Sequence, residues 1–404
     1  MGPQAVRRTA YALLATALVA CSSGGPGLKR PGFPDPRAGV WNSPVAVVES
    51  TEDDMMPDVS SSGWLVYSSK TNGNVDIYRR AFNGGSPERL TDHSSEDTDP
   101  AISPNGEKIA FSSQSADVKG DIWVMDVDGG GKRKLTDRAT SDSAPCWSPS
   151  GKAVYFTSAV LGSRERIERI DLEYGNRTVV VEDAWDASIS PDGKIVFYAA
   201  LDDDLKTRVF AKRLSDNAVA AVTDGAYPEA FPRVRPGSST GTVELLLVRF
   251  ADDRTRDATL DGNDSASIWS TRFDPALFEG GEPSTPIPLT SGSGSELFVS
   301  SVGDWIVYTT SGFGDLEVYA LPEEGVVSRR ASHEAILEAA RSEDDPSLRR
   351  LGLRTLIVTA PELAGPAHYL LARDLAERGL YAEATTSLGR AAEAFGEDPM
   401  AIVS

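Results

Sequence analysis

The sequence is poor in the side chains on which disulfide cross-linking, acid–base catalysis and nucleic-acid binding depend. Its 404 residues include two cysteines and three histidines. Forty Lys and Arg residues stand against sixty Asp and Glu, which gives a net charge of −20. The charge argues against nucleic-acid binding, because no Lys/Arg-rich face is present to displace phosphate counterions, and it has the wrong sign for anionic lipid.

A long apolar run is also absent. The apolar stretch Ala10–Ala20 is about half the length needed to span a bilayer. It follows Arg7 and Arg8, as in a signal peptide, and it ends in Leu-Val-Ala-Cys21, which resembles a bacterial lipobox. That resemblance implies that Cys21 becomes the first residue of the mature protein and carries the acyl chains of a membrane anchor.

Residues 1–20 are therefore predicted to be a lipoprotein signal peptide. Residues 21–43, rich in Gly, Pro and Ser, are predicted to be a flexible tether. The alternative is an ordinary cleaved signal peptide in which a cysteine stands by chance. A lipidated Cys21 would leave Cys146 without a disulfide partner, and we interpret Cys146 as a small buried hydrophobic residue.

An internal repeat follows the tether. Turn glycines at positions 63, 106, 151 and 193 are spaced 42 to 45 residues apart, each between a Ser- and Pro-rich turn and a short apolar strand. Later in each copy come a second strand, as in Asp76-Ile77-Tyr78, and a closing pair, as in Leu90-Thr91. This period is typical of four-stranded propeller blades.

We count six copies and predict a mainly β fold, a six-bladed β-propeller over residues 44–331 followed by a small α-helical segment at 332–404. Blade five is degenerate and contains an acidic insertion at 252–264. Two segments compete for the outer strand that closes the ring. We favour residues 45–48 at the N-terminus over residues 329–332.

The Ser-Pro-Asp/Asn-Gly turn, Asp-Ile-Tyr/Trp and Leu-Thr together resemble the repeats of TolB-type six-bladed propellers, which are related to WD-repeat propellers. The resemblance covers about residues 45–331 and is most specific in blades one to four. It implies a periplasmic protein that binds other envelope proteins. The sequence departs from TolB in showing no N-terminal α/β domain and in carrying the lipobox.

The composition after Ser332 changes to Ala, Leu, Glu and Arg at helical spacing. We expect helices at 333–342, 347–359, 364–378 and 382–395. The last two resemble one tetratricopeptide repeat, and the alternative is a generic helical hairpin.

Candidate catalytic and metal motifs are weak, and we predict neither an enzyme nor a cofactor. Residues 237–241 match G-x-S-x-G around Ser239, but that motif requires a strand-to-helix elbow and here falls in a turn of blade five. The Asp257-x-Thr259-x-Asp261-Gly262 run lacks the glutamate of a calcium loop, because Ile268 stands at its twelfth position. No metal site is predicted.

Two classes of function remain. The first is a non-catalytic interaction scaffold, lipid-anchored on the outer membrane facing the periplasm, whose partners are envelope proteins, including peptidoglycan-associated components. The second is a ligand- or metal-binding propeller, or an accessory propeller of a peptidase-like system, with its site in the central channel. Loops at 95–99, 140–144 and 183–187 would converge there. The candidate partner or ligand contacts are Glu96, Asp97, Asp99 and Trp185.

Overall fold

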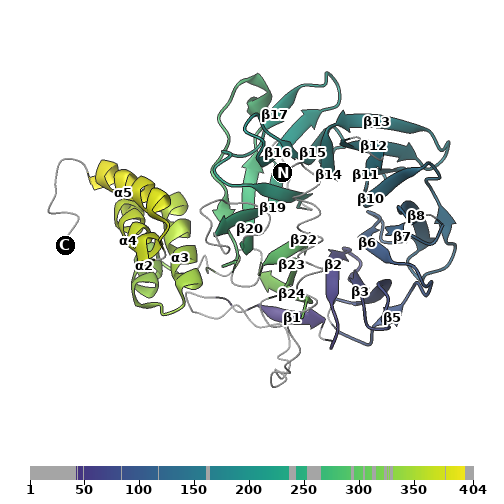
Figure 1. Ribbon diagram of the computed structural model, residues 1–404, viewed down its shortest axis with the longest axis horizontal. Coiled ribbons are helices and arrows are strands. Elements are labelled where there is room, and N and C mark those ends of the chain that lie inside the picture. The colour runs from purple at the N-terminus through teal and green to yellow at the C-terminus, as the bar shows by residue number, and fades with distance from the viewer. Residues whose placement is uncertain are drawn as a thin grey trace.

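The described part of the chain forms a six-bladed propeller with a bundle of helices at its side (Figure 1). The computed structural model describes residues 42–395, with gaps at 43, 49, 83, 117, 161–163, 236–242, 253–264, 293–294, 304, 312–314, 323–324, 326, 328–330 and 378. Cys21, Ser239 and the Asp257–Asp261 run lie outside the described residues. No described helix is long and apolar enough to cross a bilayer.

Each blade is an antiparallel sheet of four strands, which confirms the predicted fold class. Blades one to three consist of β2 (Asp54–Val59), β3 (Trp64–Ser69), β4 (Asp76–Ala81) and β5 (Glu88–Arg89); β6 (Asp97–Ile102), β7 (Lys108–Ser113), β8 (Asp121–Asp126) and β9 (Arg133–Lys134); and β10 (Thr140–Trp147), β11 (Ala153–Val160), β12 (Glu165–Asp171) and β13 (Arg177–Glu182). Blades four and five consist of β14 (Ala184–Ile189), β15 (Ile195–Leu201), β16 (Thr207–Arg213) and β17 (Val219–Ala221); and β18 (Glu229–Val234), β19 (Val243–Asp252), β20 (Ser265–Phe273) and β21 (Ile287–Pro288).

The sixth blade is built from both ends of the propeller sequence. It contains β22 (Glu296–Val302), β23 (Trp305–Thr310), β24 (Glu317–Pro322) and the N-terminal β1 (Val45–Val48), in the order β1-β24-β23-β22. Val45 pairs with Ala320, and Val48 pairs with Val318. This pairing confirms that the N-terminal strand closes the ring. The competing segment at 329–332 lies partly outside the described residues.

Apolar side chains of neighbouring blades interlock to form the core. Between blades one and two, for example, Val66 and Ile77 pack with Ile109, Phe111 and Met125, and all five are 0 to 2% exposed. A single blade has two apolar faces and cannot cover them alone, so the ring is the smallest arrangement that buries every blade.

The closing Leu-Thr pairs lie just after the short outer strands. Leu90 N–H donates to the carbonyl of Ile77 at 2.8 Å. The Thr91 hydroxyl accepts from Ile77 N–H at 2.9 Å and contacts the Asp76 carboxylate at 3.3 Å. Blade two repeats these contacts with Thr136, Ile122 and Asp121. The threonine hydroxyl therefore accepts the hydrogen bond that the next residue of the outer strand would otherwise accept. This explains why the Asp-Ile-Tyr/Trp and Leu-Thr motifs recur together.

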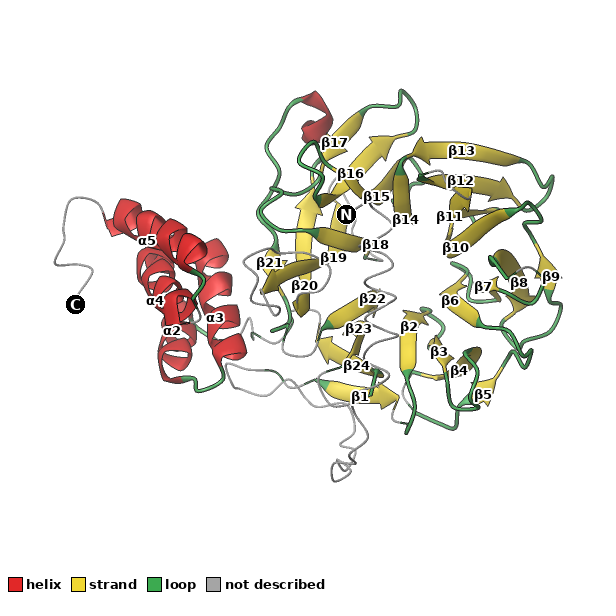
Figure 2. Cartoon of the chain, viewed as in Figure 1, coloured by secondary structure: helices red, strands yellow, loops and turns green. Residues whose placement is uncertain are grey.

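Four helices follow the propeller, at the positions that the sequence predicts to within a few residues. They are α2 (His333–Ser342), α3 (Pro346–Thr359), α4 (Ala364–Glu377) and α5 (Tyr381–Phe395). Figure 2 shows them as a separate bundle beside blades five and six, with α3 facing the propeller. Leu351 and Leu356 of α3 belong to the same buried cluster as Leu246 of blade five and Tyr308 of blade six.

Ring closure predicts that a charge in β1 destabilises the whole propeller. Val48 is 2% exposed and packs against Val318 and Ala320. We expect Val48→Asp to lower the free energy of unfolding by about 3 kcal/mol, because the carboxylate would be buried without a partner. The measurement is urea unfolding followed by circular dichroism. Val219→Asp, in the outer strand of blade four where Val219 is 54% exposed, is the matched control. Equal unfolding midpoints for the two variants would contradict closure by β1.

Candidate functional site

Each inner strand of the propeller contains a β-bulge near its middle. In β2, for example, the pairing register shifts between Met55 and Asp58, and all six inner strands do the same. One residue in each bulge is left-handed, with φ of 50 to 56°: Met56, Asp99, Ala144, Asp186, Phe231 and Phe298. A proline follows in four blades, where the bulge removes the need for a backbone N–H in the ladder.

The bulges position a ring of side chains around the propeller axis. Two residues after each left-handed residue stand Asp58, Ala101, Cys146, Ser188, Arg233 and Ser300, which we call the channel ring. All six line a cavity of about 450 Å³ in the central channel. The rest of its wall is mostly apolar and includes Val59, Ile102, Trp147, Ile189 and Phe298. The volume and lining are those of a small-molecule pocket.

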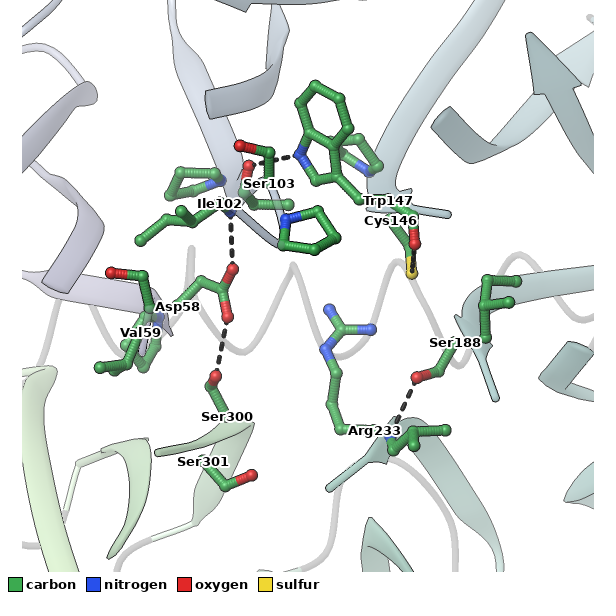
Figure 3. Close-up of a pocket in the computed structure, with 18 of the residues that line it drawn as sticks. Asp58, Val59, Ile102, Ser103, Cys146, Trp147, Ser188, Arg233, Ser300 and Ser301 are labelled. Atoms are coloured by element: carbon green, nitrogen blue, oxygen red, sulfur yellow. Dashed lines mark hydrogen bonds between the residues drawn. The ribbon is translucent and has the colours of Figure 1, made fainter. Parts of the chain in front are cut away.

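Asp58 connects three blades across this channel (Figure 3). Its Oδ2 accepts from Ile102 N–H at 2.7 Å, and its Oδ1 accepts from the Ser300 hydroxyl at 2.8 Å. Burial raises the pKa of the Asp58 carboxyl, and these two hydrogen bonds and the Arg233 charge oppose that rise. Asp58 is thus a carboxyl group of the cavity wall whose oxygens can accept further hydrogen bonds.

Arg233 and Cys146 approach the cavity from other blades. The Arg233 side chain extends from β18 into the channel, between the sides where Asp58 and Cys146 lie (Figure 3). Burial raises the pKa of the Cys146 thiol to about 11, so the thiol stays protonated near neutral pH. The Ser188 hydroxyl accepts from Val234 N–H at 2.9 Å and fixes the backbone next to Arg233.

The structure separates the four residues that the sequence suggested as contacts. Asp99 is in the bulge of β6 and lines the cavity, where its Oδ2 accepts from the Ser112 hydroxyl at 3.2 Å. Glu96 is exposed and lies directly before β6. Asp97 and Trp185 are 2% and 4% exposed and are absent from the cavity lining. The segments that we interpreted as loops are largely the inner strands β6, β10 and β14, because proline and the bulge hide the strand pattern.

Sequence reasoning missed Asp58, Arg233 and Ser300. Their signal is the channel-ring position, two residues after each left-handed residue, at which the six blades carry five different residue types. Asp58 and Ser300 are 242 positions apart in the sequence, so only the closed ring shows that they touch.

Two acidic residues near the start of inner strands, Asp142 and Glu229, are neutralised by buried arginines. Arg177 is 6% exposed at its side chain, pairs with Asp142 at 3.0 Å and also pairs with Glu168. In blade five, Arg249 pairs with Glu229 at 2.7 Å and with Asp224 at 2.6 Å. Charges saturated in this way hold the sheets together and leave little capacity for a ligand.

Among the described residues, no cluster of three or more His, Cys, Asp and Glu is arranged to hold a metal ion. His93 is exposed after the outer strand of blade one, His333 begins α2 and His368 is buried in α4.

Comparison with known proteins gives a match to a family of propellers. The family model for the Tricorn protease N-terminal beta propeller domain matches residues 48–212, which run from the end of β1 into β16. An uncharacterized protein of Agrobacterium fabrum is 41% identical over 63 residues, and this match spans 22% of that relative's length and 15% of this chain.

Solved structures resemble the propeller as well. A putative TolB from Agrobacterium tumefaciens is 21% identical and covers 68% of this chain and 92% of its own, with a TM-score of 0.48. TolB from Acinetobacter baumannii is 16% identical and covers 66% of each chain, with a TM-score of 0.45. Hydrazine synthase from Kuenenia stuttgartiensis is 13% identical and covers 70% of this chain and 45% of its own, with a TM-score of 0.50. The class is that of six-bladed β-propellers. Within it, the chain resembles the Tricorn protease N-terminal propeller over residues 48–212 and carries a C-terminal helical segment.

Asp54, the first residue of the inner strand β2, predicts a pH dependence of the propeller's stability. It is fully buried, and neither of its carboxylate oxygens accepts a well-formed hydrogen bond from a described residue. Burial raises its pKa from 3.8 to about 6, and the nearby Ser69 and Ser50 hydroxyls offset only part of this. Since the folded-state pKa exceeds the unfolded one, the protonated form stabilises the fold, and that stability is lost as pH rises from about 4 through 6.

We therefore expect Asp54→Asn to be more stable than the parent at pH 7 by about 2 kcal/mol and to show a smaller loss of stability between pH 4 and 6. Urea unfolding at a series of pH values measures both. Asp142→Asn is the opposite control, because it takes a counter-ion from Arg177 and should destabilise at pH 7. A pH slope for Asp54→Asn equal to that of the parent would show that Asp54 does not carry the effect.

Proposed function

We propose that the protein is a lipid-anchored protein of the bacterial cell envelope, on the outer membrane facing the periplasm, and that it acts as a non-catalytic scaffold for other envelope proteins. The observation that carries this proposal is the docking of the helices on the propeller. Leu351, Leu353 and Leu356 of α3 are 0 to 2% exposed within one cluster that continues into blades five and six. Arg354 Nη2 also donates to the carbonyl of Ala251 at 3.1 Å.

A buried cluster of this size favours a fixed geometry, because separating the two parts would expose it to water. The helices are then held as a rigid arm beside the ring. A rigid body with two different surfaces suits a protein that brings partners together, and it requires no chemistry of its own.

The outer face of α5 is the surface that we assign to a protein partner. Tyr381 and Leu388 are 70% and 48% exposed, and with Thr385 they follow one side of the helix at positions i, i+4 and i+7. The opposite side packs on α4, where Gly365 lies so close to α5 that an added Cβ would be 3.2 Å from the Phe395 ring and 3.3 Å from Ala394. We propose that α4 and α5 form a tetratricopeptide-like unit, whose next stacking surface is this outer face.

The partner surface gives a direct prediction. Leu388→Glu and Tyr381→Ala should keep the fold, because both side chains project into solvent, and should reduce partner recovery in a pull-down from crosslinked envelopes by about tenfold or more. Leu205→Glu is the matched control, since Leu205 is 75% exposed at the β15–β16 hairpin of blade four. Equal recovery with all three variants would contradict the α5 surface. The absence of any specifically crosslinked protein would contradict the scaffold.

The anchor gives a separate prediction. Cys21→Ser removes the thiol that the lipobox supplies for acylation, so the variant should move from the membrane pellet to the soluble fraction after cell lysis. Cys146→Ser is the control for loss of a thiol, and it should pellet with the parent. Continued pelleting of Cys21→Ser would contradict the lipid anchor.

A further inference from the structure

The central cavity contains a cation without a counter-ion in contact. No hydrogen bond or ion pair joins the Arg233 guanidinium to any residue that the structure describes. Three buried arginines of the propeller behave differently: Arg177 and Arg249 each pair with two carboxylates, and Arg235, two residues after Arg233, pairs with Glu244 at 3.3 Å. Arg233 thus presents its planar fork of donors to the cavity.

Carboxylates face the same space from other blades. Asp58 and Asp99 both line the cavity, in blades one and two, while Arg233 comes from blade five. Asp58 is held by Ile102 N–H and the Ser300 hydroxyl, and Asp99 by the Thr98 and Ser112 hydroxyls and Ala144 N–H. Both carboxylates are therefore positioned by the fold instead of by Arg233, and the Asp58 oxygens can still accept from a further donor.

We propose that this cavity binds a free amino acid, whose carboxylate pairs with Arg233 and whose ammonium group is received by Asp58. A simple anion would pair with Arg233 but be repelled by the Asp58 and Asp99 carboxylates, and a simple cation would pair with a carboxylate but be repelled by Arg233. A zwitterion satisfies both sides, because its ammonium and carboxylate groups are bonded to the same carbon and can face different walls of the cavity.

The rest of the cavity suits the remainder of such a ligand. Val59, Ile102, Ile189 and Phe298 provide apolar contact for a side chain. The volume of about 450 Å³ is large enough for an amino acid. A guanidinium–carboxylate pair can form two parallel hydrogen bonds, so Arg233 offers the ligand carboxylate a strong and directional contact.

The test compares ligands on the unaltered protein. The standard L-amino acids are screened by thermal shift, and the tightest is titrated by calorimetry beside two analogues of itself, one lacking the amino group and one lacking the carboxyl group. We expect the amino acid to bind and each analogue to bind about tenfold or more weakly, since each loses one charged hydrogen-bonded contact. Failure of every amino acid to bind, or equal affinity for the desamino analogue, would overturn the proposal.

Variants then assign the two ends. Arg233→Gln should weaken the amino acid about tenfold or more while leaving the affinity of the analogue without a carboxyl group unchanged, and Asp58→Asn should show the converse pattern. Arg164→Gln, which removes the same charge from an exposed pair with Asp183, is the matched control. Unchanged affinity in Arg233→Gln would overturn the assignment. If Arg233→Gln does not fold, the affinities of the two analogues for the parent protein still test whether both charged groups of the ligand are recognised.

Cys146 reports whether the ligand occupies the channel. Its thiol lines the cavity, so bound amino acid should slow its modification by N-ethylmaleimide, as followed at the Cys146 peptide by mass spectrometry. Calorimetric binding without protection of Cys146 would place the ligand elsewhere and contradict the site. The outcome is independent of the pull-down experiments, because no partner protein enters this assay.

Discussion

The pairing of β1 with β24 is the constraint on which the rest of the structure depends. A propeller sequence read from one end leaves blade six with three strands and an open edge, and unpaired backbone groups at an edge favour pairing with another chain. Val45–Val48, from the opposite end of the sequence, covers the edge of β24 and completes a four-stranded blade like the other five. Closure therefore joins the first and last strands of the propeller.

The closing strand is supported at the inner side of the ring as well. Asp54 N–H donates to the carbonyl of Leu316 at 2.6 Å, and Met56 N–H donates to the Thr309 hydroxyl at 3.1 Å. These contacts join blade one directly to blade six, so the seam is held at its outer edge by a strand and at its inner edge by side chains and turns. Two independent connections make closure cooperative, because opening either one strains the other.

Much of the fold could be predicted from the sequence because the repeat carries local signals. The turn glycines, the apolar strand after each turn and the Leu-Thr pairs fix the blade period, and the Ala- and Leu-rich tail fixes the helices. The inner strands were harder to see, since Pro57, Pro100 and Pro145 look like loop residues until the bulges explain them. The site could not be predicted in the same way. Asp58, Arg233 and Ser300 come from three different blades, and no local pattern shows that they meet.

The channel site and ring closure are physically linked. Asp58 lies in the first inner strand of the chain and its Oδ1 accepts from Ser300 of the last blade, so the carboxylate that faces the cavity is also part of the seam. Arg233 lines the same cavity from blade five, and only the closed ring brings blade five near blade one. A ligand that requires both charges can bind only when the ring is closed. Its binding energy would therefore add to the stability of closure by mass action, and the same contacts that recognise the ligand would oppose separation of β1 and β24.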